Sequence, residues 1–431
     1  MAITGVGVVT PIGTGADAFA AALKAGRSGV RHITAFDCGG FETQIAAEVD
    51  DTTFDATPHV EPPKMMKVMS RPTLFAVTAA SLARQAASLT PRDVDPYRLG
   101  VSLGAGGMGP VDMDIIAGQA AAIIEAAKEN GGAAEFNIPA FARIFQARTN
   151  PIAVLRGLPN LAAAHIAIQN GARGPNNTLT TACTAGTQAI GEGMRIILRG
   201  DADVVLAGGA DAMINPVGIL GFSMLGTLSR RNNDPPTASR PFDRGRDGFV
   251  IGEGSGVVVL EREDFAKARG APILAEAAGY GVTCDAYRIT DERPDASAAA
   301  RAMLNCLRDA GADPNDVGYI NAHGTGTPMN DVTETRAIKT ALGSHAYGLP
   351  VSSTKSMIGH LLAAAGAVEL VAALVAMRGG FVPPTLNHDT PDPECDLDYV
   401  PNDARPAHFD AALSNSFGFG GQNACLLIRR W

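Results

Sequence analysis

The chain has 431 residues, of which 46% are hydrophobic and only 18% are charged. This mixture can bury a large core and is not typical of a disordered protein. The formal net charge is -9, which argues against nucleic acid as a partner because phosphate binding requires clustered Lys and Arg. The 49 glycines, beside only 5% aromatic residues, indicate helices and sheets that pack with close backbone approaches.

The cysteines and the apolar segments bear on the location of the protein. The six cysteines are scattered, without a C-x-x-C pair or zinc-ligand spacing, so we expect reduced thiols and no metal site. An apolar run follows Met1 directly and leaves no room for a signal peptide. The most apolar helix, around Glu369, is shorter than a membrane span. We therefore expect a cytoplasmic protein that does not enter a membrane.

Short apolar, β-branched runs alternate along the chain with Ala-rich helical stretches. The predicted strands lie at 3–9, 99–106, 176–183, 203–210, 256–261, 317–324 and 349–355. Helices are predicted at 18–26, 73–89 and 296–311. This alternation predicts an α/β fold in which helices cover parallel sheets.

One segment, from about 112 to 161, does not follow this alternation. It holds an Ala-rich helix, a Gly-Gly break at 131–132 and the apolar stretch 136–145. A lid, a dimerisation element and an insertion all remain open for it.

The chain also contains a weak internal repeat. Residues 178–200 align with 351–379, and each stretch has the pattern strand, small polar turn and helix. Residues 99–109 align in the same way with 317–327. Two similar halves would place two strand-to-helix turns face to face about a pseudo-twofold axis, although Ala- and Gly-rich helices also match by chance.

Cys183 lies where a predicted strand ends and a helix begins. A thiol at a helix N-terminus meets the positive end of the helix dipole and free backbone N–H groups, and both stabilise a thiolate. The small residues Ala182, Ala185 and Gly186 permit a sharp turn and a close approach of substrate. Cys183 is therefore a candidate nucleophile. A buried structural cysteine is the alternative, and it is what we expect of the other five.

His323 lies at the end of another predicted strand, before a turn rich in Gly and Thr. Its ring is expected to project from this loop. Thr325 and Thr327 offer hydroxyls two residues apart, which suit hydrogen bonds to an amide-bearing ligand arm. A core histidine is the alternative, but a core site would not need Gly324 and Gly326 beside it.

A second histidine, His360, lies at a predicted helix start near Lys355. Glu369 follows about two and a half turns further along that helix. A buried Lys needs a carboxylate partner, so Lys355 and Glu369 are predicted to pair. Near the C-terminus, residues 415–424 combine two aromatics with three glycines and are interpreted as a flexible wall or gate.

A thiol and two histidines have a specific chemical use together. The thiolate accepts an acyl group by nucleophilic exchange. Two imidazole Nε2–H groups can hold a developing enolate oxygen. The combination suits decarboxylation of a β-carboxy thioester, followed by attack of the carbanion on the acyl-cysteine. A cysteine protease would need only one His, with an orienting Asn or Asp.

These motifs resemble the β-ketoacyl synthase family of the thiolase superfold, and most closely its β-ketoacyl-[acyl-carrier-protein] synthase II group. The matching segments run along essentially the whole chain: ITGVGVVTPIG, TACTAG, SRPFDRGRDGFVIGEGSG, NAHGTGTPMND, STKSMIGHLLAAAGAVE, DPECDLDYVP and NSFGFGGQNA. The resemblance implies two duplicated βαβαβαββ halves in a five-layered α-β-α-β-α arrangement. Residues 1–264 would form the half with the nucleophile and the extended segment 112–161, and residues 265–431 the half with both histidines.

The resemblance also implies a role for each residue of the central cluster. Cys183 matches the acyl-accepting nucleophile. His323 and His360 match the pair that promotes decarboxylation and forms the enolate site. Lys355 and Glu369 match the polar pair that supports these histidines.

Further residues match the family's binding surfaces. Thr325 and Thr327 match the hydroxyls that hold the phosphopantetheine arm, Phe419 the gating aromatic, and Phe222 another wall residue. The backbone N–H groups of Cys183 and Phe419 would form the oxyanion hole.

The acyl pocket and the surface of the protein complete this set. The pocket floor is expected at Gly107 and Met108. A basic surface that meets acidic acyl carrier protein is expected from Lys64, Lys67 and Arg230 or Arg231, with solvated charges as the alternative.

The expected activity is carrier-protein-dependent condensation without metal or redox cofactor, in a homodimer or a heterodimer with a related ketosynthase-fold subunit. A non-catalytic subunit that shapes a partner's pocket is one alternative. A biosynthetic thiolase with Cys425 as second catalytic cysteine is another. The acyl chain and the choice between fatty-acid and polyketide pathways stay open, and Arg288 stands where the fatty-acid enzymes usually have His.

Overall fold

The computed structural model describes residues 1–106, 112–129 and 137–431. Its strands are β1 (Ala2–Thr10), β2 (Gly13–Thr14), β3 (Val30–His32), β4 (Ile45–Ala47), β5 (Leu99–Ala105), β6 (Asn176–Leu179), β7 (Val204–Asp211), β8 (Gly254–Glu261), β9 (Ala275–Cys284), β10 (Tyr319–Asn321), β11 (Val351–Ser352), β12 (Phe381–Val382), β13 (Arg405–Pro406), β14 (Ala411–Gly418) and β15 (Gln422–Arg429). Its α-helices are α1 (Ala16–Lys24), α2 (Arg71–Ala86), α3 (Met113–Glu129), α4 (Ile138–Arg148), α5 (Pro151–Arg156), α6 (Leu161–Asn170), α7 (Ala185–Leu198), α8 (Pro216–Met224), α9 (Glu263–Ala268), α10 (Ser297–Asp309), α11 (Pro328–Leu342), α12 (Lys355–Ile358) and α13 (Ala365–Gly379). Each strand and helix predicted from the sequence is confirmed, with ends that differ by a few residues.

The main sheet repeats one strand order in both halves of the chain. The order is β1-β8-β7-β5-β6 in the N-terminal half and β9-β15-β14-β10-β11 in the C-terminal half. In each half the last strand in sequence, β8 or β15, runs antiparallel to both its neighbours. The three strands beyond it, towards the edge of the sheet, are parallel to one another. The halves join where β1 pairs with β9. The predicted duplication is confirmed.

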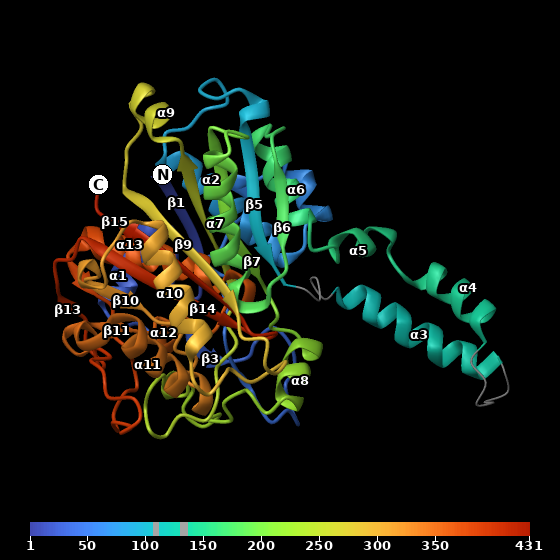
Figure 1. Ribbon diagram of the computed structural model, residues 1–431. Coiled ribbons are helices and arrows are strands. Elements are labelled where there is room, and N and C mark those ends of the chain that lie inside the picture. Colours follow the sequence, from blue (N-terminus) through green and yellow to red (C-terminus); the bar gives the residue numbers. More distant parts are fainter. Residues whose placement is uncertain (107–111, 130–136) are drawn as a thin grey trace.

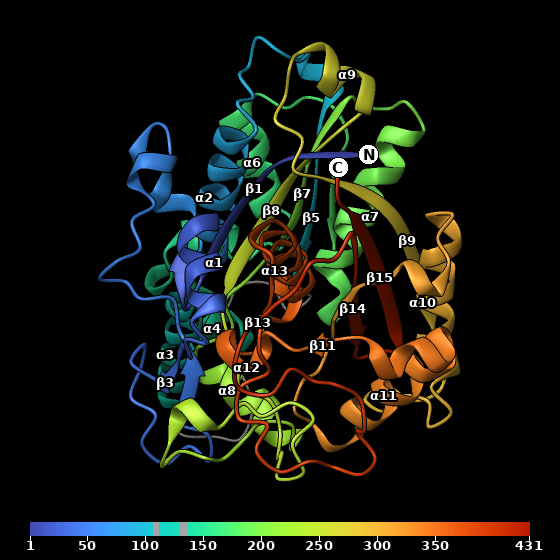
Figure 2. The same ribbon diagram turned by 90° about the vertical axis from the view of Figure 1, so that its left-hand side faces the viewer.

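The helices form three layers around the two halves of the sheet. α2 and α6 cover the outer face of the N-terminal half, and α10 and α11 cover that of the C-terminal half (Figures 1 and 2). α7 and α13 lie side by side between the halves. This is the predicted five-layered arrangement. The predicted division at 264 and 265 stays a prediction, and it falls inside α9.

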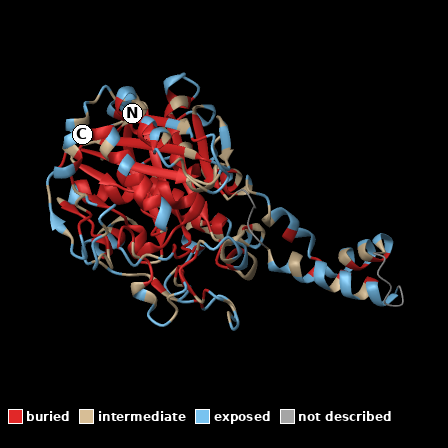
Figure 3. Ribbon diagram, turned by 60° about the horizontal axis from the view of Figure 1, so that its bottom comes forward, coloured by how far each residue is buried: buried red, intermediate tan, exposed pale blue. Residues whose placement is uncertain are grey.

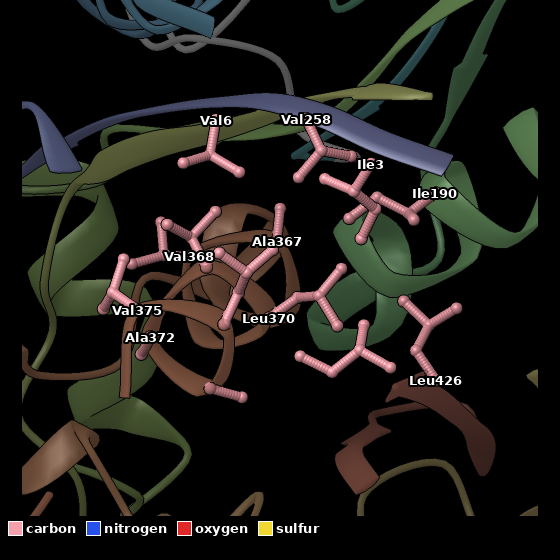
Figure 4. Close-up of a cluster of buried hydrophobic side chains, with 14 of the residues drawn as sticks. Ile3, Val6, Ile190, Val258, Ala367, Val368, Leu370, Ala372, Val375 and Leu426 are labelled. Carbon is pink, nitrogen blue, oxygen red and sulfur yellow. The ribbon is translucent and has the colours of Figure 1, made fainter. Parts of the chain in front are cut away.

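Aliphatic side chains fill the space between the two halves of the sheet. Figure 4 shows Val368 and Leu370 of α13 between Val6 and Val258 of the N-terminal half and Leu426 of β15. All of them are buried in one hydrophobic cluster. Burial of aliphatic side chains on this scale is the main stabilising contribution in such a fold.

The central helical run is longer than the sequence suggested. Residues Leu362–Gly379 form 18 residues of helix that are apolar enough to cross a membrane by composition. However, 89% of this run is buried inside the protein. Its apolar character therefore matches its place between the two halves of the main sheet.

The segment that broke the strand–helix alternation forms a helical arm, α3 and α4. The two helices pack through a small cluster formed by Ala122, Ala126, Ala140 and Ile144. Figures 1 and 3 show that the arm extends away from the body and is largely exposed. Its exposed large apolar side chains include Ile123, Ile124 and Ile138.

Candidate active site

Two strand-to-helix turns, one from each half, bring the candidate residues together. Cys183 lies in the short 3-10 turn that leads into α7, and His360 immediately precedes the turn that leads into α13. In each turn one non-glycine residue has a left-handed backbone, Ala182 with φ of 49° and Leu362 with φ of 50°. Such conformations are strained and persist where the surrounding structure holds them. The matching turns confirm the predicted internal repeat.

The structure places Cys183, His323 and His360 in direct contact. The Sγ atom of Cys183 lies 3.1 Å from Nε2 of His360. The sulfur and one ring nitrogen of each histidine lie within 4.8 Å of one another. The two imidazole rings are 5.3 Å apart between centroids and nearly perpendicular. The three residues predicted to act together therefore form one cluster.

The hydrogen-bond partners of the histidines determine where each neutral ring carries its proton. The backbone N–H of Leu362 donates to Nδ1 of His360 at 3.2 Å. The Nζ ammonium of Lys355 lies 3.3 Å from Nδ1 of His323 and can only donate. Both Nδ1 atoms are therefore acceptors. Each neutral ring then carries its proton on Nε2.

Burial determines the charge of the cluster. It lowers the pKa of both His323 and His360 well below the usual value, and the positive charge of Lys355 adds to this effect. Both rings are therefore neutral at pH 7. Burial also raises the pKa of the Cys183 thiol to about 12, although Lys355 opposes the shift. In the free protein, desolvation therefore outweighs the influences that would lower the pKa of the thiol.

Lys355 and Glu369 form the predicted pair. Both side chains are almost fully buried, and the ammonium donates to a carboxylate oxygen of Glu369. The same ammonium donates to the backbone carbonyl of His323 at 2.6 Å. The pair thus fixes the loop that carries His323 as well as its ring.

Two buried carboxylates that the sequence did not suggest hold the histidine turns. Glu334 of α11 accepts the backbone N–H groups of His323 at 2.8 Å and of Gly324 at 2.7 Å. Asp211 at the end of β7 accepts the N–H of Ala363 at 3.1 Å. Burial raises the pKa of Glu334 to about 7 and that of Asp211 to about 6. Strand and helix patterns carry no sign of either contact, since both form only in the folded chain.

A cavity of about 400 Å³ opens around the cluster. The predicted wall residues Thr325, Thr327, Phe222 and Phe419 all line it. The hydroxyls of Thr325 and Thr327 are 2.9 Å apart, so they can act on one ligand group. Phe222 packs edge-on against Phe249, a ring that the sequence did not single out and that also touches His360.

Two further expectations concern the extent of this cavity. Gly107 and Met108, predicted for the pocket floor, lie outside the described residues. None of the described residues of the helical arm lines the cavity. The cavity is also lined by residues that the sequence did not suggest, among them Leu225, Glu292 and Met329.

Phe419 lies in the tight connection between β14 and β15. A side chain at the preceding Gly418 would come within 3.2 Å of the backbone nitrogen of Cys183. The backbone beside Phe419 therefore lies directly against the nucleophile turn. This placement suits the predicted oxyanion hole, whose two donors would be the N–H groups of Cys183 and Phe419.

The four predicted surface cations do not share one environment. Lys64 and Lys67 are exposed and form no ion pair with any residue that the structure describes. Arg230 pairs with Glu42 at 2.7 Å, and Arg231 lies 3.5 Å from a carboxylate oxygen of Asp247. Arg231 is therefore near the cavity, since Asp247 lines it.

Cysteine and histidine are also the side chains that zinc prefers, and the ligand atoms of these three residues lie close enough together to hold one ion. A metal would need a lone pair on the ring nitrogens that face the sulfur. Hydrogen-bond donors occupy both Nδ1 atoms instead, so Nε2 presents an N–H on each ring. The cluster is arranged to bind a developing anion.

Comparison with known proteins identifies relatives along the whole chain. Family models of the β-ketoacyl synthase N-terminal and C-terminal domains match residues 1–266 and 274–389. A 3-oxoacyl-[acyl-carrier-protein] synthase 2 of Synechocystis sp. is 44% identical over 429 residues, which cover 100% of this chain and 97% of that protein.

Two solved structures share the fold. One is a type II polyketide ketosynthase in complex with its acyl-carrier protein and bound to a hexaketide. Its TM-score is 0.84 at 36% identity, and the match covers 100% of this chain and 98% of that one. The other is the ishigamide ketosynthase/chain length factor, with a TM-score of 0.85, 36% identity and the same coverage.

Proposed function

The chain belongs to the β-ketoacyl synthase family, and from this premise we propose that it is a 3-oxoacyl-[acyl-carrier-protein] synthase of fatty-acid or polyketide biosynthesis. Its reaction has two halves. An acyl group moves from carrier protein to Cys183, and decarboxylated malonyl-carrier protein then attacks this thioester. The observation that carries the proposal is the pair of Nε2–H donors beside Cys183 Sγ.

Acyl transfer begins with attack of the Cys183 sulfur on the carrier-bound thioester. The carbonyl oxygen gains negative charge, which the N–H groups of Cys183 and Phe419 stabilise. The thiol proton of Cys183 passes to the departing pantetheine thiolate. Because the pKa of Cys183 is raised to about 12, the proton leaves the sulfur as the new bond forms, not beforehand.

Condensation requires a carbanion from the malonyl group. As CO2 leaves, the thioester oxygen becomes an enolate, and the Nε2–H groups of His323 and His360 donate to it. The enolate carbon then attacks the acyl group on Cys183. The C–S bond breaks, the β-ketoacyl product stays on carrier protein, and Cys183 takes up a proton.

The two alternative functions have less support. A non-catalytic subunit would not need a complete Cys-His-His cluster with Lys355 and Glu369 behind it. A biosynthetic thiolase would need a second cysteine at the site. Cys425 lies buried on β15, where its thiol contacts Asn415 at 3.3 Å, and it does not line the cavity.

Partners and surroundings are part of the proposal. Acyl carrier protein would meet Lys64 and Lys67, because exposed, unpaired cations suit an acidic partner. The exposed apolar side chains of the helical arm support a dimer, of two copies or with a related ketosynthase-fold subunit. Two of the solved relatives are a complex with carrier protein and a ketosynthase/chain length factor.

All six cysteines are free, which suits a reducing cytoplasm. No cofactor takes part in the proposed steps.

The test is condensation by the purified chain with acyl- and malonyl-carrier proteins. Cys183→Ala should abolish the β-ketoacyl product. Cys38→Ala, which alters a cysteine outside the cavity, should retain it. Undiminished product with Cys183→Ala would overturn the proposal, and preference for free coenzyme A thioesters would favour the thiolase.

A further inference from the structure

Asp211 is a buried carboxylate beside the active site that the steps above do not use. One oxygen accepts the N–H of Ala212 at 2.9 Å, and the other accepts the N–H of Ala363 at 3.1 Å. Among the residues that the structure describes, none forms an ion pair with it. A buried carboxylate without a cation is costly. Here one of its two hydrogen bonds goes to the turn that carries His360.

This turn needs support from outside itself. Leu362 is strained, with φ of 50°, and its N–H fixes the proton of His360 on Nε2. The next residue, Ala363, rests on β7. A side chain at Gly209 would lie 2.6 Å from the Ala363 carbonyl oxygen, so only glycine permits the approach. Strand β7 therefore holds Ala363 from both sides, through Gly209 at its carbonyl and Asp211 at its N–H.

We propose that Asp211 is a positioning residue that holds the His360 turn, so that the Nε2–H of His360 points at the reacting thioester. It serves His360 as Glu334 serves His323: Glu334 accepts two backbone N–H groups of its histidine turn, and Asp211 accepts one. The inference rests on the proposed condensing activity. It predicts that Asp211 matters for decarboxylation, where His360 acts, and much less for acyl transfer to Cys183.

The charges around Asp211 add a pH dependence. It faces Glu253, which is paired with Arg71, and Cys183. Burial raises the pKa of Asp211 to about 6, and Glu253 adds to the shift. As the pH falls through this value, one oxygen gains a proton and stops accepting. The turn then loses a hydrogen bond, so decarboxylation should fall on the acid side.

The test measures the two half-reactions separately in Asp211→Asn. The amide keeps the size of the side chain but replaces one acceptor oxygen by a donor, so the two backbone N–H groups cannot both be satisfied. CO2 release from malonyl-carrier protein should fall at least tenfold. Acylation of Cys183, followed by mass spectrometry, should be unchanged or faster. Burial is the main cause of the raised pKa of Cys183, and the substitution removes the smaller contribution of the Asp211 charge. The acid limb near pH 6 in the CO2-release profile should also vanish.

Asp203→Asn, which alters the Asp that immediately precedes β7, serves as the control and should leave both rates unchanged. Gly106→Ala provides a second perturbation, because its methyl would lie 3.0 Å from a carboxylate oxygen of Asp211. It should also slow CO2 release selectively. An equal loss in both half-reactions, or no loss in either variant, would overturn the inference. A wild-type chain that makes no product would instead overturn the proposed function.

Discussion

The ring nitrogens that face Cys183 are donors because of what lies behind them. Lys355 donates to one Nδ1 atom and the N–H of Leu362 to the other. Burial keeps both rings neutral. Neutral Nε2–H donors suit an anion that appears only during the reaction, since a charged imidazolium would bind the ground-state malonyl carboxylate as well. At the scale of single residues, the site therefore depends on buried partners of the histidines.

The Lys355–Glu369 pair is the first such partner to test. Lys355→Met leaves the Glu369 carboxylate buried and unpaired, which should lower the free energy of unfolding by about 3–5 kcal/mol. The double variant Lys355→Met/Glu369→Leu removes both charges and should recover most of this stability in urea unfolding. Its CO2 release should nevertheless stay slower than that of the wild type, because Nδ1 of His323 has lost its donor. A double variant as unstable as the single one would contradict the account.

Glu334 predicts a pH dependence of stability. Its pKa is raised by burial from 4.5 to about 7. Because the folded pKa is the higher one, its contribution to stability is present below about pH 4.5 and is lost as the pH rises towards 7. Relative to Glu334→Gln, the wild type should lose about 3 kcal/mol over that range, since one pKa unit corresponds to about 1.4 kcal/mol. Urea unfolding at several pH values measures this. A difference that does not vary with pH would contradict it.

At the scale of elements, two strained turns depend on glycine packing. The turn before α13 lies against Gly209 of β7 and Gly186 of α7, where a side chain would collide with the Ala363 carbonyl. The sequence predicted such close approaches from its glycine content. It also located both strand-to-helix turns, because their small residues follow β-branched runs.

Gly209→Ala tests this packing. The added methyl would lie 2.6 Å from the carbonyl oxygen of Ala363, so the turn must shift. We expect the free energy of unfolding to fall by about 1–3 kcal/mol, with slower condensation. Gly221→Ala on α8 is the matched control, because nothing lies within 4 Å of its new methyl. Its stability should stay the same or rise by about 0.5–1 kcal/mol. Equal effects in the two variants would argue against the role of Gly209.

At the scale of the whole molecule, the features with local sequence signals could be predicted, whereas the tertiary contacts could not. The duplicated halves, Cys183 and both histidines follow from repeated patterns and turn chemistry. Asp211 carries no such signal, since its partner Ala363 is 152 residues away. The raised pKa of Cys183 carries no sequence signal either, because burial is a property of the folded chain. The sequence also could not predict that the arm projects from the body, because it does not show whether the arm packs against the sheet and its helices.

The arm carries the prediction about assembly. Two exposed apolar residues on α3, Ile123 and Ile124, have about half of their surface accessible. If they bind a second copy, the wild-type chain should have the mass of a dimer in light scattering, and Ile123→Glu/Ile124→Glu should shift it towards the monomer. Met224→Glu on α8 changes an even more exposed residue and should leave the mass unchanged. A monomeric wild type would contradict a homodimer.

The most direct test of the account follows the acyl group itself. Mass spectrometry would locate the acyl group after incubation with acyl-carrier proteins of increasing chain length, before and after malonyl-carrier protein is added. We expect an acyl group on Cys183 for the accepted chain lengths. Malonyl-carrier protein should then remove it, with CO2 and a β-ketoacyl-carrier product in equal amounts. An acyl group on another residue, or one that stays on Cys183 after CO2 is released, would contradict it.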